Sequence, residues 1–431
     1  MKQTARPNST GASLSFGVLG KLLFGGLPGK DLHKVLLARG LMSASRALAG
    51  VLVPIYLVLL GFGATALGLL FMGVAFAAVV LSYSVGVLSD RFGPKPFLIV
   101  FPLLVAAASI VFAFTQDTSV LVVMAMVASY GRGAGAGAGQ VGPYQPAESS
   151  LIVSAVSAKE RNKAFSRVTM FSSFGALVGS MLAVVSRSKS GSHSFVMLEF
   201  RTSMLLVGAM ALLAALVVIP IANHKVEANG LREEGRQRLP KSARALILRL
   251  WATNTLNGLS VGLYGPFITY WFYRRYGVDT ATIGVLYTIV NVVALSSGII
   301  APTLANRFGL IRATVMLRIA QSVILIPWAL SPTFALAGIF YTSRMVFQRA
   351  SLPLRQSYAL GQAPEGSKAR VSSISNIPSQ LAMAASPAAA GVIYDSVSLE
   401  LPLILGGVLQ LASTCLYYIF FKDRPPSEEQ S

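Results

Sequence analysis

Cysteine is almost absent from this 431-residue chain, in which Cys415 is the single example. Because it lies in an apolar stretch and has no second cysteine to pair with, no internal disulfide framework is possible. Charge is scarce as well: charged residues make up 12% of the sequence, whereas soluble domains carry roughly 25%. Acidic residues are the rarer sign, with 16 against 36 lysines and arginines. This composition excludes a disulfide-rich scaffold and argues against an ordinary soluble domain.

Residues suited to catalysis or metal binding are also few. The three histidines, His33, His193 and His224, all lie outside the apolar stretches and have no second ligand at metal-site spacing. The glycine-rich run from Gly131 to Gly142 has no Lys-Ser/Thr pair, so it is not a nucleotide-binding loop. We therefore predict no enzyme activity, no cofactor and no ATP-driven transport.

Long apolar runs dominate what remains, since 54% of the residues are hydrophobic. Runs of about 20 residues are long enough to cross a ~30 Å hydrocarbon core. The sequence thus predicts an all-α polytopic membrane protein with twelve transmembrane helices. The expected spans are 35–60, 65–88, 97–116, 119–155, 164–186, 201–222, 244–273, 279–304, 310–330, 333–361, 371–394 and 399–421, of which the fourth and tenth are unusually long.

The distribution of basic residues predicts the orientation of these spans. Of the 36 lysines and arginines, 22 fall on the side of the two termini, five on the opposite side and nine within spans. This asymmetry is the positive-inside pattern, which places both termini in the cytoplasm. The net charge of +20 then reflects topology and attraction to anionic lipid rather than nucleic-acid binding.

The longest polar run divides the chain into two halves. We expect a cytoplasmic tail at 1–34, a six-helix bundle at 35–222, a cytoplasmic linker at 223–243, a second six-helix bundle at 244–421 and a tail at 422–431. The halves share a charged turn: "GVLSDRFGPKP" begins at Gly86 and "TLANRFGLIRA" at Thr303. Two units repeated in the same orientation are typical of transporters.

The first copy of this turn carries the resemblance to a known family. Gly86, Leu88, Asp90, Arg91, Gly93 and Lys95 fill the pattern G-x-L-x-D-R-x-G-x-K/R, and the second copy keeps Arg307 and Gly309 but has Asn306 in place of the acid. Span four adds an arginine followed by close glycines, namely Arg132, Gly135 and Gly137. Over nearly its whole length the chain resembles the major facilitator superfamily of secondary transporters.

The resemblance implies a gating role for the repeated turn. Asp90 and Arg91 would lock the cytoplasmic side when the outer side is open, and the copy with Asn306 would be a weaker latch. The gating set is then Gly86, Asp90, Arg91, Gly93, Lys95, Arg307 and Gly309. The alternative is that the basic residues only anchor the topology and Gly93 only shapes the turn.

Polar groups deep in the spans are the candidates for substrate binding, because a charge at the centre of a helix costs about 2.5–3.5 kcal/mol on insertion scales. The resemblance implies that spans one, four, seven and ten line the central cavity. The predicted substrate-binding residues are Arg46, Arg132, Arg344, Gln348 and Asn257. The excess of arginine favours a small substrate with an anionic group; the alternative is that these arginines bond to helix carbonyls or to packing polar groups.

Glu148 is the single acid well inside a span and is the predicted proton-coupling residue. A lone carboxyl group in a low-dielectric setting suits the binding and release of a proton. The alternative is an ion pair with an arginine such as Arg167, near the inner boundary of its span.

Spans four, five, ten and eleven look similar to those of multidrug-type efflux members. Gly175 and Gly179 match an antiporter spacing, although Ala176 stands where a proline is expected. Proton-coupled efflux of small organic solutes, by a monomer in the plasma (inner) membrane, is therefore the first hypothesis. Uptake or exchange of an anionic metabolite, a carboxylate or phosphate ester, is the second. A non-transporting receptor or a lipid scramblase is the alternative from another class.

Overall fold

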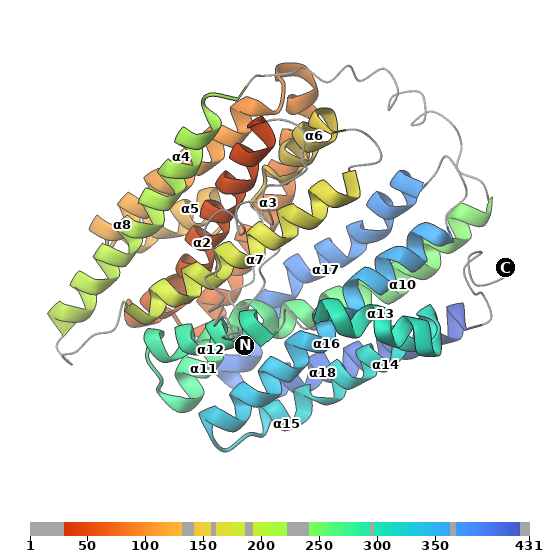
Figure 1. The fold of residues 1–431 in the computed structure, drawn as a ribbon. Coiled ribbons are helices and arrows are strands. Elements are labelled where there is room, and N and C mark those ends of the chain that lie inside the picture. The colour runs from red at the N-terminus through yellow and green to blue at the C-terminus, as the bar shows by residue number, and fades with distance from the viewer. Residues whose placement is uncertain are drawn as a thin grey trace, which may run out of the picture.

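The computed structural model describes residues 30–131, 142–156, 161–185, 193–221, 241–293, 297–362 and 368–422. Within these ranges the regular structure is entirely helical, and the helices form two bundles that lie against each other (Figure 1). The predicted fold class, an all-α membrane protein of two bundles, is confirmed. The predicted linker and both predicted tails fall almost wholly outside the described residues.

The N-terminal bundle contains the first six predicted spans. Its helices are α2 (Lys30–Leu59), α3 (Ala64–Phe92), α4 (Lys95–Phe114), α5 (Thr118–Ala128), α6 (Gln145–Ala155), α7 (Arg161–Val185) and α8 (His193–Val218). The C-terminal bundle contains α10 (Lys241–Tyr264), η1 (Gly265–Phe267), α11 (Ile268–Tyr276), α12 (Thr280–Val293), α13 (Ser297–Phe308), α14 (Leu310–Val323), α15 (Leu325–Ala329), α16 (Phe334–Gly361), α17 (Lys368–Ser396) and α18 (Leu401–Phe421). Seven of the described helices are long and apolar enough to cross a membrane.

Several spans are built from more than one helix, and the sequence explains some of the breaks. Span 119–155 is unusually long because α5 ends at Ala128, where Ser129 adopts a left-handed conformation with φ of 54°. A second helix, α6, follows after residues 132–141, which lie outside the described part of the chain. In span 244–273 the ring of Pro266 lies in the short 3₁₀ turn between α10 and α11, where its missing N–H interrupts the α-helical ladder.

Glycines allow helices within each bundle to approach closely. A β-carbon at Gly179 would overlap the carbonyl oxygen of Ala44, and one at Gly258 would overlap that of Ser379. The first contact joins α7 to α2 and the second joins α17 to α10, so each bundle uses glycine at the equivalent helix pair. Small residues at such positions let backbones pack tightly in a bilayer, where the hydrophobic effect between helices is weak.

The repeated turn has the same backbone in both halves. Gly93 has φ and ψ of 86° and 162°, and Gly309 has 79° and 159°. The amide nitrogen of Gly93 donates to the carbonyl of Ser89 at 2.9 Å, and that of Gly309 donates to Ala305 at 2.9 Å. The internal repeat therefore extends to the hydrogen bonds of this turn.

We expect Gly93→Ala to lower the free energy of unfolding by about 1–3 kcal/mol, because this region of φ and ψ is accessible essentially to glycine alone. Thermal unfolding of the purified protein in detergent measures the effect. Gly86→Ala is the matched control in α3, the helix that precedes this turn, since a β-carbon there would lie 3.9 Å from its nearest neighbour, Pro146. Equal unfolding midpoints for the two variants would contradict the strain argument.

The two bundles meet closely at one end of the molecule, which we call the closed end: the end at which α2 and α17 finish and α3 and α12 begin. A β-carbon at Gly68 of α3 would overlap the carbonyl oxygen of Pro387 in α17, and one at Gly391 would overlap that of Ala64. Here α12 also packs against α7, and α11 against α2, as the lower left of Figure 1 shows. Towards the opposite end the helices of the two bundles diverge (Figure 1).

Candidate substrate and coupling site

A buried ion pair occupies the interior of the N-terminal bundle. The guanidinium group of Arg39 in α2 donates to the carboxylate of Glu148 in α6, and the exposed fractions of the two side chains are 6% and 3%. The sequence interpretation of Glu148 as a lone carboxyl group is wrong. Its partner among the described residues is Arg39, so the alternative of an ion pair with an arginine holds, with Arg39 in the place of Arg167. The pairing follows from helix packing, which places residues 109 positions apart against each other.

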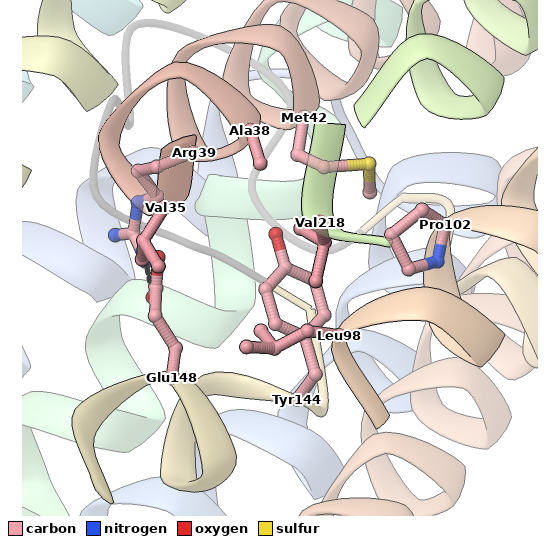
Figure 2. A pocket seen from close by; sticks show the side chains of 9 residues that line it. All are labelled: Val35, Ala38, Arg39, Met42, Leu98, Pro102, Tyr144, Glu148 and Val218. Atoms are coloured by element: carbon pink, nitrogen blue, oxygen red, sulfur yellow. Dashed lines mark hydrogen bonds and ion pairs between the residues drawn. The ribbon is translucent and has the colours of Figure 1, made fainter. Parts of the chain in front are cut away.

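A small pocket lies beside this pair (Figure 2). Tyr144, one turn before Glu148, points its hydroxyl group into the pocket between α2 and α4. That hydroxyl is buried and has no hydrogen-bond partner among the described residues, and the same holds for Nε of Arg39. The remaining lining is apolar: Val35, Ala38, Met42, Leu98, Pro102 and Val218. The ion pair is thus enclosed by apolar groups, which makes the loss of either partner costly.

Arg46 lies two turns further along α2 and bonds to backbone rather than to an acid. Its guanidinium group donates to the carbonyl oxygens of Ala128 at 3.2 Å and Ser129 at 2.8 Å. These carbonyls belong to the C-terminus of α5, where the helix leaves acceptors without intrahelical partners. These contacts fit the alternative stated for the span arginines, in which the guanidinium group bonds to helix carbonyls and so stabilises a neighbouring helix end.

Arg344 is fully buried in the C-terminal bundle, with 1% of its surface exposed. It donates to the hydroxyl of Tyr264 and, at 3.0 Å, to the amide oxygen of Gln348, and its guanidinium carbon lies 4.7 Å from the centre of the Tyr264 ring. The structure therefore brings together Arg344 and Gln348, two predicted site residues, on one face of α16. Tyr264, in α10, contacts the Arg344 member of this pair.

Asn257, the other predicted polar residue of this bundle, lies apart from Arg344. Its amide oxygen accepts from Arg318 at 3.3 Å and lies 3.5 Å from Nε2 of Gln410. Arg132 lies outside the described residues, so its relation to these groups is not part of the structure.

A chain of hydrogen-bonded polar side chains crosses between the bundles. Arg349 of α16 donates to the amide oxygen of Asn291 in α12 at 2.9 Å, and the amide nitrogen of Asn291 donates to the hydroxyl of Ser180 in α7 at 3.3 Å. Arg349 is half-buried, whereas Asn291 and Ser180 are buried. These hydrogen bonds connect Arg349, a basic residue on a predicted cavity-lining span, directly to the contact between the two bundles.

A second cross-bundle contact caps a helix at the closed end. Asp395 of α17 accepts hydrogen bonds from the backbone nitrogens of Ala64 at 2.9 Å and Thr65 at 2.7 Å, and from the Thr65 hydroxyl at 2.7 Å. Its negative charge therefore lies at the N-terminus of α3, where the helix dipole favours it. No sequence motif pointed to Asp395, because its partners lie 330 positions away.

The predicted gating residues lie at the opposite end, at the turns after α3 and α13. Arg91 is exposed and its guanidinium carbon lies 5.5 Å from the centre of the Phe92 ring. Arg307 repeats this arrangement over Phe308 at 5.3 Å. The side chain of Asp90 is outside the described set, so the latch itself stays a prediction. Gly86 and Lys95 flank the turn in α3 and α4.

Comparison with known proteins agrees with this architecture. The sequence profile described as Major Facilitator Superfamily matches residues 35–347 and 250–431. An uncharacterized membrane protein of Saccharomyces cerevisiae, YJR124C, is 20% identical over 387 residues, which cover 82% of this chain and 85% of that protein.

Two of the solved structures that share the fold serve as examples. A bacterial homologue of the human lysosomal transporter Spinster, in an inward-facing and unoccupied conformation, has a TM-score of 0.70 at 14% identity and covers 92% of this chain and 98% of its own. A POT family transporter in complex with 5-aminolevulinic acid has a TM-score of 0.71 at 12% identity, over 93% and 97% of the chains. The family match spans both bundles, and the chain belongs to the Major Facilitator Superfamily.

Proposed function

We propose that this protein is a secondary active transporter that moves small organic solutes by alternating access, with proton-coupled efflux as the leading mode. The observation that carries the proposal is the contact between the bundles at the closed end. Gly68 and Gly391 allow backbones from the two bundles to touch, while Asp395 and the Arg349–Asn291–Ser180 chain add polar bonds that separation of the helices would break.

We assign the closed end to the outside of the cell. The short loops predicted near 61–64 and 395–398 lie at this end and contain no lysine or arginine, which is the signature of external loops. The conformation is then inward-facing, like that of the similar Spinster homologue. In this state the cytoplasmic latch around Asp90 would be released, and it would re-form when the outer side opens.

Proton coupling is assigned to Glu148 together with Arg39. When Glu148 is ionised, the pair is neutral overall and joins α2 to α6 inside the N-terminal bundle. Protonation removes the negative partner and leaves a buried arginine uncompensated, which is unfavourable by several kcal/mol unless the helices move or another anion replaces the carboxylate. This coupling between charge and helix position is what a proton-driven cycle needs.

We assign to the transporter a small substrate that carries an anionic group. Arg344 and Gln348 form one polar cluster, Arg46 and Asn257 are the further candidates, and Arg132 completes the proposed set. Guanidinium groups pair with carboxylates and phosphate esters through two parallel hydrogen bonds. Carboxylate uptake or exchange is therefore the second candidate mode, and the bound 5-aminolevulinic acid of the similar POT family transporter has the same chemistry. A receptor or scramblase role is disfavoured, because it would have no use for a gate at each end.

The test is transport by protein reconstituted in liposomes, across a panel of carboxylates, phosphate esters and cationic dyes, with and without a pH gradient. We expect Glu148→Gln to lose accumulation driven by the pH gradient while it retains exchange of labelled substrate between equal pools. Exchange needs the conformational cycle but no net proton movement. The ratio of driven uptake to exchange should fall by at least about tenfold.

Glu400→Gln is the matched control. Glu400 also pairs with an arginine, Arg275, but both side chains of that pair are partly exposed at the closed end. An exposed pair contributes about 0–1 kcal/mol, so this variant should keep both activities. Full pH-driven accumulation by Glu148→Gln would remove the residue from the coupling mechanism, and transport of cationic dyes alone would remove the anionic substrate.

A further inference from the structure

The pocket beside the Arg39–Glu148 pair lies on the side of the N-terminal bundle that faces away from the C-terminal bundle. Its lining side chains come from α2, α4, α6 and α8, together with Tyr144. Helices α4 and α8 pack against each other and against helices of their own bundle, at the outer edge of the molecule (Figure 1). The pocket is therefore set apart from the region between the bundles, where a transported solute would bind.

The pocket also lies near one end of the molecule. Val35 is in the second turn of α2, Leu98 is the fourth residue of α4, and Val218 is the last residue of α8. Helix α2 finishes at the closed end, and α4 begins directly after the turn at Gly93, so these helix ends lie opposite the closed end. This is the end that we assign to the cytoplasm. The pocket is within roughly two helical turns of that surface.

An ion pair on the same surface lies one turn outside the pocket. Lys34 bonds to the carboxylate of Asp31 at 3.0 Å and donates to the carbonyl oxygen of Pro220 at 3.4 Å. Lys34 is one turn before Ala38. Pro220 follows shortly after Val218, and both Ala38 and Val218 line the pocket. Since both side chains of the ion pair are partly exposed, the cytoplasmic side of the pocket lies next to solvent and to a carboxylate that can accept a proton.

The interior of the pocket suits a single water molecule. Its volume is about 10 Å³, which is close to the smallest space that holds one water. A buried water also needs two to four polar partners. Three lining side chains are polar, namely Tyr144, Arg39 and Glu148, and each is less than a tenth exposed. The hydroxyl group of Tyr144 points into this space (Figure 2).

A metal cation is a poor occupant of the same space. The guanidinium group of Arg39 would repel it, because charges are weakly screened away from water. The carboxylate of Glu148, which a cation would need as a ligand, is already paired with Arg39. A water molecule is neutral and both donates and accepts hydrogen bonds, so it can bond to a hydroxyl and to a carboxyl group at once. The chemistry of the lining therefore favours a proton over a metal ion as the species exchanged here.

We propose that this pocket holds one water molecule, bonded to the Tyr144 hydroxyl, through which Glu148 exchanges its proton with the cytoplasm by a route separate from that of the substrate. The inference rests on the proposed function, in which Glu148 carries the coupling proton. Tyr144 is a positioning residue, because it holds the water and neither gains nor loses a proton overall.

Release of the proton is a simple transfer between oxygens. The O–H bond of the Glu148 carboxyl group breaks, and the proton forms a new O–H bond with the pocket water. That water passes one of its protons to water at the cytoplasmic surface and is neutral again. The carboxylate that remains pairs with Arg39, which is the arrangement in this structure.

The charges around Glu148 agree with a brief stay of the proton on the water. Arg39 of α2 contacts the carboxylate directly. Lys95 of α4 and Arg167 of α7 belong to the first two turns of their helices, and Arg91 to the last turn of α3. All of these helices pack against α6. Because basic groups disfavour an excess positive charge nearby, the proton does not rest in the pocket but moves on to solvent.

Infrared spectroscopy of the full-length purified protein in detergent tests this route without transport. The C=O band of a protonated carboxyl group that Glu148→Gln lacks reports on Glu148, and a rapid jump to alkaline pH gives the rate of proton release. We expect Tyr144→Phe, which removes only the hydroxyl, and Ala38→Leu, which fills the pocket, to slow release by at least about tenfold each. Positioned groups contribute roughly 10²–10⁴-fold to proton transfer.

Tyr130→Phe is the matched control. The hydroxyl of Tyr130 is also buried in the N-terminal bundle, but it bonds to Ser109 at 2.5 Å and to Val105 at 3.3 Å, and none of these three residues lines the pocket. This variant should release the proton at the wild-type rate. In Tyr144→Phe the band should keep its full amplitude, whereas a general structural defect would reduce it. If Ala38→Leu fails to fold, the comparison of the two tyrosine variants carries the test.

The outcomes separate this inference from the proposed function. A wild-type release rate in Tyr144→Phe, or in a folded Ala38→Leu, would overturn the pocket route and leave Glu148 as the coupling residue. A Glu148 band that does not respond to pH would overturn both proposals. Slowed release in a protein that moves no solute would support the water site and overturn the transport proposal alone.

Discussion

Replacing Asp395 with asparagine should open the closed end. The carboxylate accepts three hydrogen bonds from Ala64 and Thr65 of the other bundle, whereas an asparagine offers one acceptor oxygen and presents an N–H₂ group to backbone N–H donors. Hydrogen bonds to a charged group contribute about 1.5–3 kcal/mol each. Losing the equivalent of one such bond shifts the equilibrium between the two conformations by roughly tenfold or more towards the outward-open state.

Thiol labelling of a buried reporter at the contact measures this shift. Cys415 is exposed, so it is first changed to serine. Ser180→Cys then places a thiol of nearly the same shape where α7 meets α12. The Ser180 side chain is 2% exposed in this structure, in which the bundles touch at the closed end. We expect the labelling rate of this reporter to rise by about the same factor in Asp395→Asn, since labelling follows the population of the open state.

Asp117→Asn is the matched control for this experiment. Asp117 also caps a helix, because its side chain accepts from the backbone nitrogens of Ser119 and Val120 at the start of α5, but all of these residues lie in one bundle. Asparagine is an equally good helix cap. The control should leave the labelling rate unchanged. Equal labelling rates in the wild type and Asp395→Asn would show that the carboxylate does not hold the bundles together.

Gly391→Ala should reduce transport more than Asp395→Asn does. A β-carbon at this position would overlap the carbonyl oxygen of Ala64 in the other bundle, and a backbone atom cannot move aside as a flexible side chain can. The two bundles must then separate at the closed end. We expect the variant to fold, to label rapidly at the Ser180→Cys reporter, and to lose at least about 90% of its transport rate, because the cycle would lack its inward-facing state.

Gly179→Ala provides the contrast that tests this explanation. The overlap there, with the carbonyl oxygen of Ala44, is equally severe, but it lies between α7 and α2 inside one bundle. This overlap destabilises the folded N-terminal bundle itself, so the unfolding midpoint should drop and the yield of folded protein should decrease. Gly40→Ala is the neutral control, since a β-carbon there would lie 3.5 Å from the oxygen of Phe171. A lower midpoint for Gly391→Ala than for Gly179→Ala would contradict the assignment of Gly391 to the contact between bundles.

Much of the fold could be predicted from the sequence, because it depends on local properties. Whether a segment crosses the membrane is set by the hydropathy of about 20 consecutive residues, and most of the described helix ends lie within a few residues of the predicted spans. The repeated turn at Gly93 and Gly309 could be recognised for a similar reason, since its backbone needs glycine. Pro266 likewise marks a break in its span.

The candidate site was less accessible to sequence reasoning. The arginines within spans could be named, because a charge in an apolar run is visible by itself, but their partners could not. Glu148 contacts Arg39 rather than standing alone, Arg46 bonds to the end of α5, and Arg344 bonds to Tyr264. Each partner depends on how two helices are rotated and tilted against each other, and hydropathy does not specify either quantity.

The sequence by itself determined that the chain spans a membrane, that it is built from two related halves and that its basic residues gather on one side. Tertiary structure alone decided which end is closed, which arginine bonds to an acid, and which bonds to neutral groups, as Arg318 does to Ser413 and Asn257. The physical reason is one of range. Insertion and turns are settled by residues close in sequence, whereas Asp395 finds Thr65 only after both bundles have formed and met, 330 positions apart in the chain.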